Sequence, residues 1–185
     1  MKALLAGGLI LALCSACTQS APSSSSAGAA SGSPLAPTEI VVPLNFGTHL
    51  IGEHETPARD SPAQGQAIFK VSPDGFSVSY RLIASNIQNV TASHIHQGPV
   101  GSPGPPVVFL YGNAAPGGGQ HDGVLATGEL TAANLIGPLL GQPISALVAL
   151  IQSGNAYVNV HTNDGVDPAN TGPGDFPGGE IRGQL

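Results

Sequence analysis

The sequence has few of the residues that thiol chemistry, nucleic-acid binding or a helical fold would require. Of its 185 residues two are cysteines, none is tryptophan and only 5 are lysine or arginine. The 11 acidic residues bring the formal net charge to −6, which excludes a basic surface for nucleic acid. With 26 glycines, 17 prolines and 9% charged residues, the composition argues against a helical bundle or a coiled coil. At 41% hydrophobic, the chain is still too apolar to be disordered throughout.

Both cysteines lie in an N-terminal segment that has the pattern of a secretory signal. Lys2 supplies a positive charge, an apolar run covers residues 3–13, and small residues precede Cys17. The apolar run is too short for a membrane-spanning helix. We therefore expect residues 1–16 to be a signal peptide and the protein to be exported.

The three residues Ser15-Ala16-Cys17 resemble the bacterial lipobox, which implies that Cys17 is lipidated and anchors the chain to a membrane. The alternative is ordinary cleavage near Ala16 or Ala21, which would release a soluble exported product. With Cys17 lipidated, no other cysteine remains, so disulfides, thiolate metal sites and cysteine catalysis are excluded. Thr18 stands where an aspartate would indicate inner-membrane retention, so we expect the outer membrane or the cell surface of the envelope.

The segment that follows Cys17 differs in composition from the rest of the chain. Up to residue 38 it consists mainly of serine, alanine, glycine and proline. It lacks the large apolar side chains that would offset the entropy cost of ordering, so residues 17–38 are predicted to be the lipidated cysteine and a flexible tether. The folded domain is expected over residues 39–185.

Short alternating segments separated by turn residues predict strands in this domain. In the clearest of them Phe76, Val78, Tyr80 and Leu82 are expected on one face of a strand. The turn-forming residues 72–75 precede it, which indicates a hairpin with a strand over residues 64–71. Further strands are predicted over residues 40–46, 91–96, 107–111, 124–130, 156–161 and 180–185.

Two short helical runs are predicted between the later strands, over residues 132–140 and 144–152, with Thr131 as an N-cap and Gly154 as a stop. The predicted fold is therefore mainly β, an antiparallel β-sandwich or barrel of about seven to eight short strands with one or two short helices in a crossover. No dinucleotide, P-loop, zincin or nucleophile-elbow motif is present, so no catalytic residue is assigned.

Three segments in order resemble the CHRD domain, named after chordin. They are Ala92–Gly98 with the strand over 107–110, then Tyr157–Thr162, then Phe176–Leu185. The resemblance covers residues 44–185 and implies an extracellular β-sandwich module without an assigned activity. We expect a non-enzymatic module that binds a protein or polymer of the cell envelope. Residues 163–175 depart from the family pattern as an insertion rich in Asp, Asn, Gly and Pro.

The period of two along a strand predicts that three histidines converge. His94 and His96 share a strand face, and the apolar Val158 and Val160 place His161 on the face away from the core. Three imidazoles are the minimum for a catalytic-type zinc site or a copper site, so Zn²⁺ or Cu²⁺ is the expected metal. Ligation needs neutral imidazole, so affinity is expected to fall below about pH 6.5, the ordinary histidine value. A fourth ligand could come from one of the remaining histidines, His49, His54 or His121.

The alternative is that these histidines hydrogen-bond loop backbone and serve only the fold. A structural polar cluster is expected beside them, consisting of Asn159, Thr162, Glu180 and Arg182. Glu180 and Arg182 share one face of the last strand, where they would form an ion pair or where Arg182 would bind loop carbonyls.

Three further hypotheses stay open at this point. The His-x-His pattern on a β-sandwich is similar to that of copper/zinc superoxide dismutase, although the zinc loop and the disulfide of that family are missing. A hydrolase or isomerase with a His/Glu site has no positive signal beyond residue types. Residues 163–170 offer hard oxygen ligands for Ca²⁺, but they fail the EF-hand spacing and fit ordinary turn chemistry.

Overall fold

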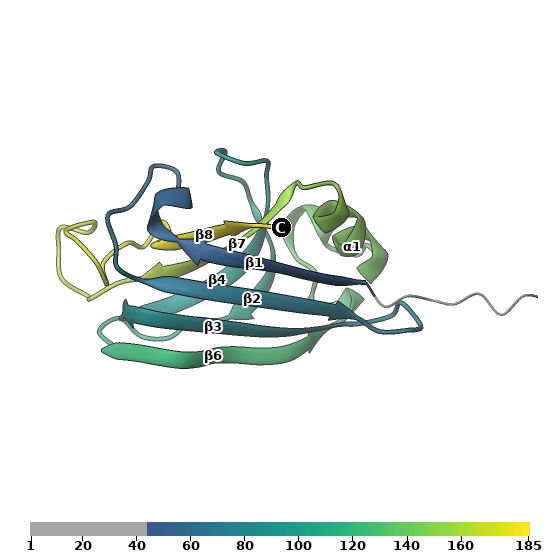
Figure 1. Cartoon of the computed structure of the whole chain (residues 1–185), viewed down its shortest axis with the longest axis horizontal. Helices are drawn as coiled ribbons and strands as arrows, with labels where there is room; N and C mark the ends of the chain where they lie inside the picture. Colours follow the sequence, from purple (N-terminus) through teal and green to yellow (C-terminus); the bar gives the residue numbers. More distant parts are fainter. Residues whose placement is uncertain (1–43) are drawn as a thin grey trace, which may run out of the picture. The chain divides into compact units, whose positions relative to one another are not determined.

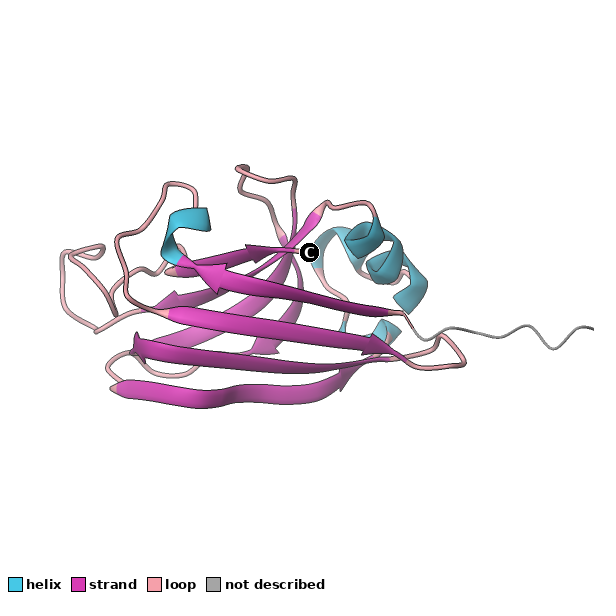
Figure 2. Cartoon of the chain, in the orientation of Figure 1, coloured by secondary structure: helices cyan, strands magenta, loops and turns pink. Residues whose placement is uncertain are grey.

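The structure, a computed structural model, describes residues 44–185 (Figure 1). The predicted signal peptide, Cys17 and the tether lie outside the described residues. Within the described part, eight antiparallel strands form one nearly closed, barrel-like sheet, accompanied by one α-helix and three short 3₁₀ helices (Figure 2). The predicted fold class is confirmed. None of the described helices has the length and apolar character needed to cross a membrane.

The strand order in the sheet is β5-β4-β7-β8-β1-β2-β3-β6. The strands are β1 Asn45–Ile51, β2 Gln64–Val71, β3 Val78–Gln88, β4 Val90–Gln97, β5 Pro106–Tyr111, β6 Gln120–Leu130, β7 Ala156–Thr162 and β8 Ile181–Gln184. The helices are η1 Gly52–His54, η2 Ala132–Asn134, η3 Gly137–Leu139 and α1 Ile144–Gln152. The Tyr80 hydroxyl of β3 donates to the Leu110 carbonyl of β5 at 2.6 Å, a link between the two ends of the sheet.

The strand predicted over residues 64–71 forms as β2, and strict alternation of buried and exposed residues along it places Ala67, Phe69 and Val71 in the core. The predicted β2–β3 hairpin also forms, with Gly75 in the left-handed conformation (φ 74°) that favours glycine. Phe76 is an exception: it precedes β3 and its side chain is 76% exposed, so its predicted place on one strand face with the buried Val78 and Leu82 is wrong. The turn is longer than expected, because Ser72 Oγ and the Ser72 amide bind Ser77 and delay the start of β3 to Val78.

Two other predicted elements differ from the structure. The first strand covers residues 45–51 rather than 40–46, and residues 40–43 lie outside the described part. The helix predicted over 132–140 is replaced by η2 and η3, because Leu135 between them is extended and bridges to Val108 of β5. Gly137 has φ 53° and Pro138 follows it, which prevents a continuous α-helix here. The helix over 144–152 is confirmed as α1.

The core lies inside the curved sheet and contains side chains from most strands and from α1. Fully buried members are Leu50, Phe69, Leu82, Ile95, Leu147, Val158 and Ile181. On β4 and β7 the residues that alternate with this core set are polar, and they point to the other face of the sheet. That face is where the site lies.

Candidate metal centre

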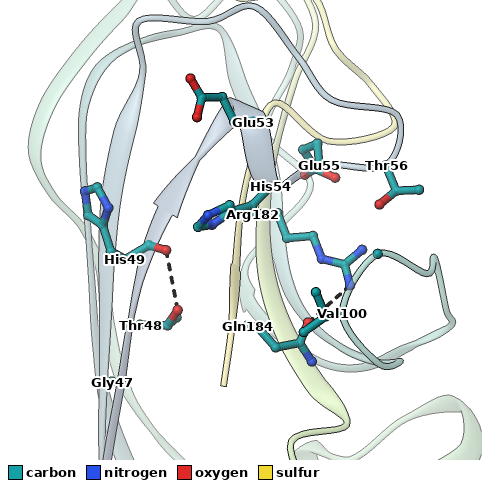
Figure 3. A pocket seen from close by; sticks show the side chains of 11 residues that line it. Gly47, Thr48, His49, Glu53, His54, Glu55, Thr56, Val100, Arg182 and Gln184 are labelled. Carbon is teal, nitrogen blue, oxygen red and sulfur yellow. Dashed lines mark hydrogen bonds between the residues drawn. The ribbon is translucent and has the colours of Figure 1, made fainter.

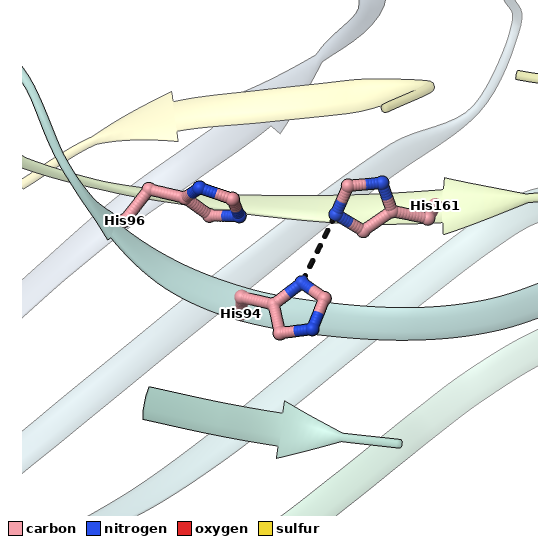
Figure 4. Close-up of side chains that lie close together, drawn as sticks. All are labelled: His94, His96 and His161. Atoms are coloured by element: carbon pink, nitrogen blue, oxygen red, sulfur yellow. Dashed lines mark hydrogen bonds between the residues drawn. The ribbon is translucent and has the colours of Figure 1, made fainter. Parts of the chain in front are cut away.

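The antiparallel register of β4 and β7 brings the three histidines together. His94 pairs with Asn159 and Ala92 pairs with His161, so the two histidines are diagonal neighbours across the strands. His96 follows two residues after His94 on the same strand face. One nitrogen from each ring lies within 4.8 Å of the others, and the close-up shows the three rings facing a common point (Figure 4). The structure thus places the predicted residues side by side.

Two backbone carbonyls determine which nitrogen of two rings carries the proton. His96 Nδ1 lies 2.8 Å from the Gly104 carbonyl, and His161 Nδ1 lies 2.9 Å from the Pro177 carbonyl. A carbonyl oxygen only accepts hydrogen bonds, so each Nδ1 is the donor and each Nε2 of the neutral ring keeps a lone pair. Such outer contacts fix the ring orientation of metal-binding histidines.

The ring of His94 contacts the ring of His161 directly. His94 Nδ1 lies 3.0 Å from His161 Nε2. Because His161 Nδ1 already donates to a carbonyl, His94 Nδ1 is the donor in this pair. A metal that takes both nitrogens would displace this single proton. Ligand nitrogens around a tetrahedral Zn²⁺ lie roughly 3.3 Å apart at the usual bond length, so this spacing suits a metal after small shifts of the rings.

The surroundings keep the three rings neutral. Burial lowers the pKa of His94 to about 4, and its histidine neighbours contribute in the same direction. Burial also lowers the pKa of His96 and of His161. Neutral imidazole is the form that binds a metal, so burial extends the binding form of the three rings to pH values below the ordinary histidine value of 6.5.

Two aromatic rings complete the walls of the site. The ring of Phe109 contacts His94 at a centroid distance of 4.4 Å, and the ring of Tyr157 stacks on His96 at 4.9 Å. His96 is 8% exposed, and its Nε2 is buried without a hydrogen-bond partner. The backbone bonds expected under the structural alternative are therefore present at His96 and His161, but they do not use the nitrogens that face one another.

The other three histidines do not join this group. His49 and His54 line a pocket on β1 and η1, and His121 lies on β6. Among residues 44–185 the cluster of metal-ligating side chains contains only His94, His96 and His161. The structure gives no support to a fourth histidine ligand.

Glu180 is fully buried and belongs to a separate hydrogen-bonded group. Its carboxyl oxygens accept hydrogen bonds from Ser61 Oγ at 2.6 Å, Thr162 Oγ1 at 2.6 Å and the Gly174 amide at 2.9 Å. Thr162 Oγ1 in turn accepts from the Phe176 amide. These bonds attach the 163–179 loop to β7, and they position the Pro177 carbonyl that His161 uses.

Arg182 binds loop carbonyls rather than Glu180. Its guanidinium donates to the carbonyls of Pro99 and Ser102, each at 3.0 Å, and lies 3.4 Å from the ring centroid of Tyr157. The Tyr157 hydroxyl accepts from the Gly104 amide at 3.0 Å. The 98–105 loop is thereby fixed over β7 and presents its Gly104 carbonyl to His96.

Glu55 is a residue of this region that no sequence pattern selects. It is 8% exposed, and burial raises its pKa to about 7 despite the neighbouring Arg182, Arg59 and Asn159. It follows η1 in an irregular segment, where no periodicity or motif indicates burial. Glu55 Oε1 and Asn159 Oδ1 are buried and have no hydrogen-bond partner among the described residues.

Glu55 and Arg182 also line a pocket of about 640 Å³ between β1, η1, β8 and the 98–105 loop (Figure 3). This volume is in the range of small-molecule sites. The remaining lining residues are mostly polar or small: Gly47, Thr48, His49, Glu53, His54, Thr56, Val100, Gly101 and Gln184.

The loop considered for Ca²⁺ uses its side-chain oxygens in turns. Asn163 Oδ1 accepts from the Gly165 amide and Asp164 Oδ1 accepts from the Val166 amide. Asp175 Oδ2 accepts from the amide and the hydroxyl of Thr171. These are the local bonds of Asx and related turns, as the structural interpretation of this loop expects.

Comparison with protein families gives one result. The model of the CHRD domain matches residues 46–185, nearly all of the described chain. The chain belongs to the CHRD-domain family. The predicted resemblance is thereby confirmed, and the matched range contains the three histidines, both loops and the residues that line the pocket. Comparisons with curated proteins and with solved structures gave no match.

Proposed function

We propose that this CHRD domain is a non-enzymatic binding module of the cell envelope and that its His triad holds Zn²⁺ or Cu²⁺. The observation that carries the proposal is the convergence of three imidazole nitrogens within 4.8 Å on one face of β4 and β7. Imidazole nitrogen suits both metals, and three protein ligands with a further open position are the arrangement of catalytic-type zinc sites.

Three properties of the site support metal binding over a purely structural role. Two of the rings are oriented by backbone carbonyls at their Nδ1 atoms. Burial favours the neutral, binding form of all three rings. His96 Nε2 has no partner, and an unpaired buried acceptor costs about 1–3 kcal/mol, which a bound cation would offset.

Addition of metal to chelator-treated protein tests the proposal. We expect Zn²⁺ or Cu²⁺ to raise the melting temperature of the purified protein, and EDTA to reverse the increase. The increase should be absent in a variant that carries His94→Ala, His96→Ala and His161→Ala together. If neither metal raises the melting temperature of the wild type, the metal-binding function is wrong.

The location of the module is a second part of the proposal. The signal-like residues 1–16 and the lipobox-like Ser15-Ala16-Cys17 support export and attachment through a lipid on Cys17. We expect Cys17→Ser to shift the protein from the membrane fraction to a soluble or uncleaved form. Unchanged partitioning, with no lipid mass on the mature N-terminus, would contradict the anchor. An envelope protein or polymer remains the proposed partner.

A redox role similar to that of copper/zinc superoxide dismutase is a narrower alternative. Only the His94-x-His96 pattern and the nearby His161 favour it. A dismutase assay on copper-loaded protein decides the matter, since activity that the triple alanine variant lacks would support it.

A further inference from the structure

Three buried polar atoms in this part of the domain have no hydrogen-bond partner. They are His96 Nε2, Asn159 Oδ1 and Glu55 Oε1. All three belong to residues that are less than 9% exposed. His96 Nε2, whose ring carries its proton on Nδ1, and Asn159 Oδ1 are both acceptors, so neither can satisfy the other. Native proteins leave few such atoms unpaired, and a group of them indicates a ligand or water that is absent from the protein chain itself.

Asn159 is the residue that links this row of atoms to the triad. It is the cross-strand partner of His94 and lies two residues from His161 on the same strand face. Gly179 packs against both Asn159 Nδ2 and Glu55 Oε1, so the amide nitrogen of Asn159 lies on the side of Glu55. Its carbonyl oxygen lies on the other side, toward the histidines of the same strand face.

The 163–179 loop holds Asn159 in this orientation. Gly179 has φ 128°, and a Cβ atom at this position would lie 2.9 Å from Asn159 Nδ2 and would also collide with Glu55 Oε1. The loop backbone thus covers the Asn159–Glu55 contact at a distance that only glycine allows. With its amide nitrogen on the side of Gly179 and Glu55, Asn159 presents its acceptor oxygen to the histidines.

We propose that the metal held by the triad keeps an open coordination position that takes a neutral hydrogen-bond donor, with water as the resident ligand, and that Asn159 positions this ligand by accepting its hydrogen bond. The inference rests on the proposed metal binding. A metal satisfies the lone pair of His96, and a metal-bound water has the O–H groups that Asn159 Oδ1 lacks. An anion without a proton, such as azide, offers Asn159 no donor, so the position selects water or another O–H or N–H ligand over such anions.

Pulsed electron paramagnetic resonance of the copper-loaded protein in D₂O tests the open position. We expect nitrogen couplings from imidazoles together with deuterium modulation from one coordinated water, which high azide concentrations remove. Imidazole couplings without coordinated water, before and after azide, would overturn the inference and leave the metal-binding function intact. Absence of imidazole couplings would instead contradict the metal-binding function.

Asn159→Leu tests the role of the positioning residue. Leucine has a similar shape and no acceptor, so water loses its hydrogen bond and azide loses an unfavourable neighbour. We expect copper to stay bound and the azide affinity to rise about fivefold, the factor that one hydrogen bond supplies. Asn155→Leu, which changes an exposed asparagine, should leave the azide affinity unchanged. An unchanged azide affinity in copper-loaded Asn159→Leu would refute the role of Asn159. If this variant does not fold, Asn159→Ala, which also lacks an acceptor, carries the same comparison with a smaller side chain.

Discussion

The domain contains two buried polar groups close to each other, and they differ in how well their atoms are paired. The carboxyl group of Glu180 receives three hydrogen bonds, from Ser61, Thr162 and the Gly174 amide. In the group around the triad, His96 Nε2 and Asn159 Oδ1 have no partner. The two groups lie on opposite faces of β7, since Thr162 alternates with Asn159 and His161 along the strand. The Glu180 group attaches the 163–179 loop to β7. The group around the triad has acceptors that a bound metal or water would use.

This difference assigns separate roles to residues that the sequence suggested as one polar cluster. Thr162 and Glu180 belong to the saturated group, and Asn159 belongs to the unsaturated one. Arg182 is saturated as well, through the Pro99 and Ser102 carbonyls. A saturated group should respond to mutation in the same way with and without metal. A mutation in the unsaturated group should change stability by different amounts with and without metal.

The largest effect is expected at Glu180. Glu180→Leu leaves two buried donors, Thr162 Oγ1 and the Gly174 amide, and the half-buried Ser61 hydroxyl without an acceptor. Each unsatisfied buried donor costs about 1–3 kcal/mol. We therefore expect the free energy of unfolding, measured by urea denaturation, to fall by more than about 3 kcal/mol, equally with and without Zn²⁺. Glu129→Leu, at an exposed position of β6, is the control and should change it by less than about 0.5 kcal/mol. A loss that zinc restores would show that Glu180 belongs to the metal site.

Replacement of Glu55 should stabilise the protein rather than destabilise it, because nearby charges and hydrogen bonds do not offset the cost of burying its carboxylate. Its pKa is about 7 in the folded protein against an ordinary value of 4.5. The folded state thus binds the proton more tightly than the unfolded state. The stability that this proton contributes is present below pH 4.5 and is lost as the pH rises to 7. At about 1.4 kcal/mol for each pH unit between these values, the loss at pH 8 is up to about 3 kcal/mol.

Glu55→Gln removes this loss, since glutamine stays neutral. The variant should gain stability over the wild type between pH 5 and pH 8, as measured by urea denaturation at several pH values. Glu53→Gln, an exposed neighbour, provides the matched control. A difference between Glu55→Gln and the wild type that does not change with pH would show that the Glu55 carboxyl is better compensated than its surroundings indicate.

Single histidine variants test which of the three imidazoles bind the metal. Each of His94→Ala, His96→Ala and His161→Ala should abolish the stabilisation by zinc, which is about 2.7 kcal/mol at a concentration 100 times the dissociation constant. His54→Ala, outside the triad, should keep it in full. A zinc increment that survives in one of the three variants would remove that histidine from the ligand set.

The smallest effect is expected for the segment before the domain. Deletion of residues 18–38 should change the melting temperature little, because their composition offers few large apolar side chains for packing. Differential scanning calorimetry measures the difference. A clear loss of stability would show that the predicted tether belongs to the folded domain.

The fold and the triad are predictable from the sequence because both follow from the period of two. Val158 and Val160 occupy the core, so His161 must face the other side, and His94 and His96 must share a face. The period of two does not predict that β4 and β7 are neighbours in the sheet. The structure shows that they pair.

The outer parts of the site are not predictable in this way. Glu55, the Gly104 carbonyl and the Pro177 carbonyl come from three irregular segments, whose position depends on long-range bonds such as those of Arg182 and Glu180. Local periodicity does not encode such bonds. The same limit explains the failed helix over 132–140, where the contact of Leu135 with β5 outweighs helical propensity.

X-ray absorption spectroscopy of zinc-loaded protein tests the central claim most directly. One zinc per chain should show three imidazole nitrogens at about 2.0–2.1 Å and one further light atom, the arrangement of an open tetrahedral site. The spectrum of the protein with His94→Ala, His96→Ala and His161→Ala provides the background from adventitious zinc. Zinc scattering without imidazole, or identical in the wild type and the triple variant, would contradict the assignment of the triad as a metal site.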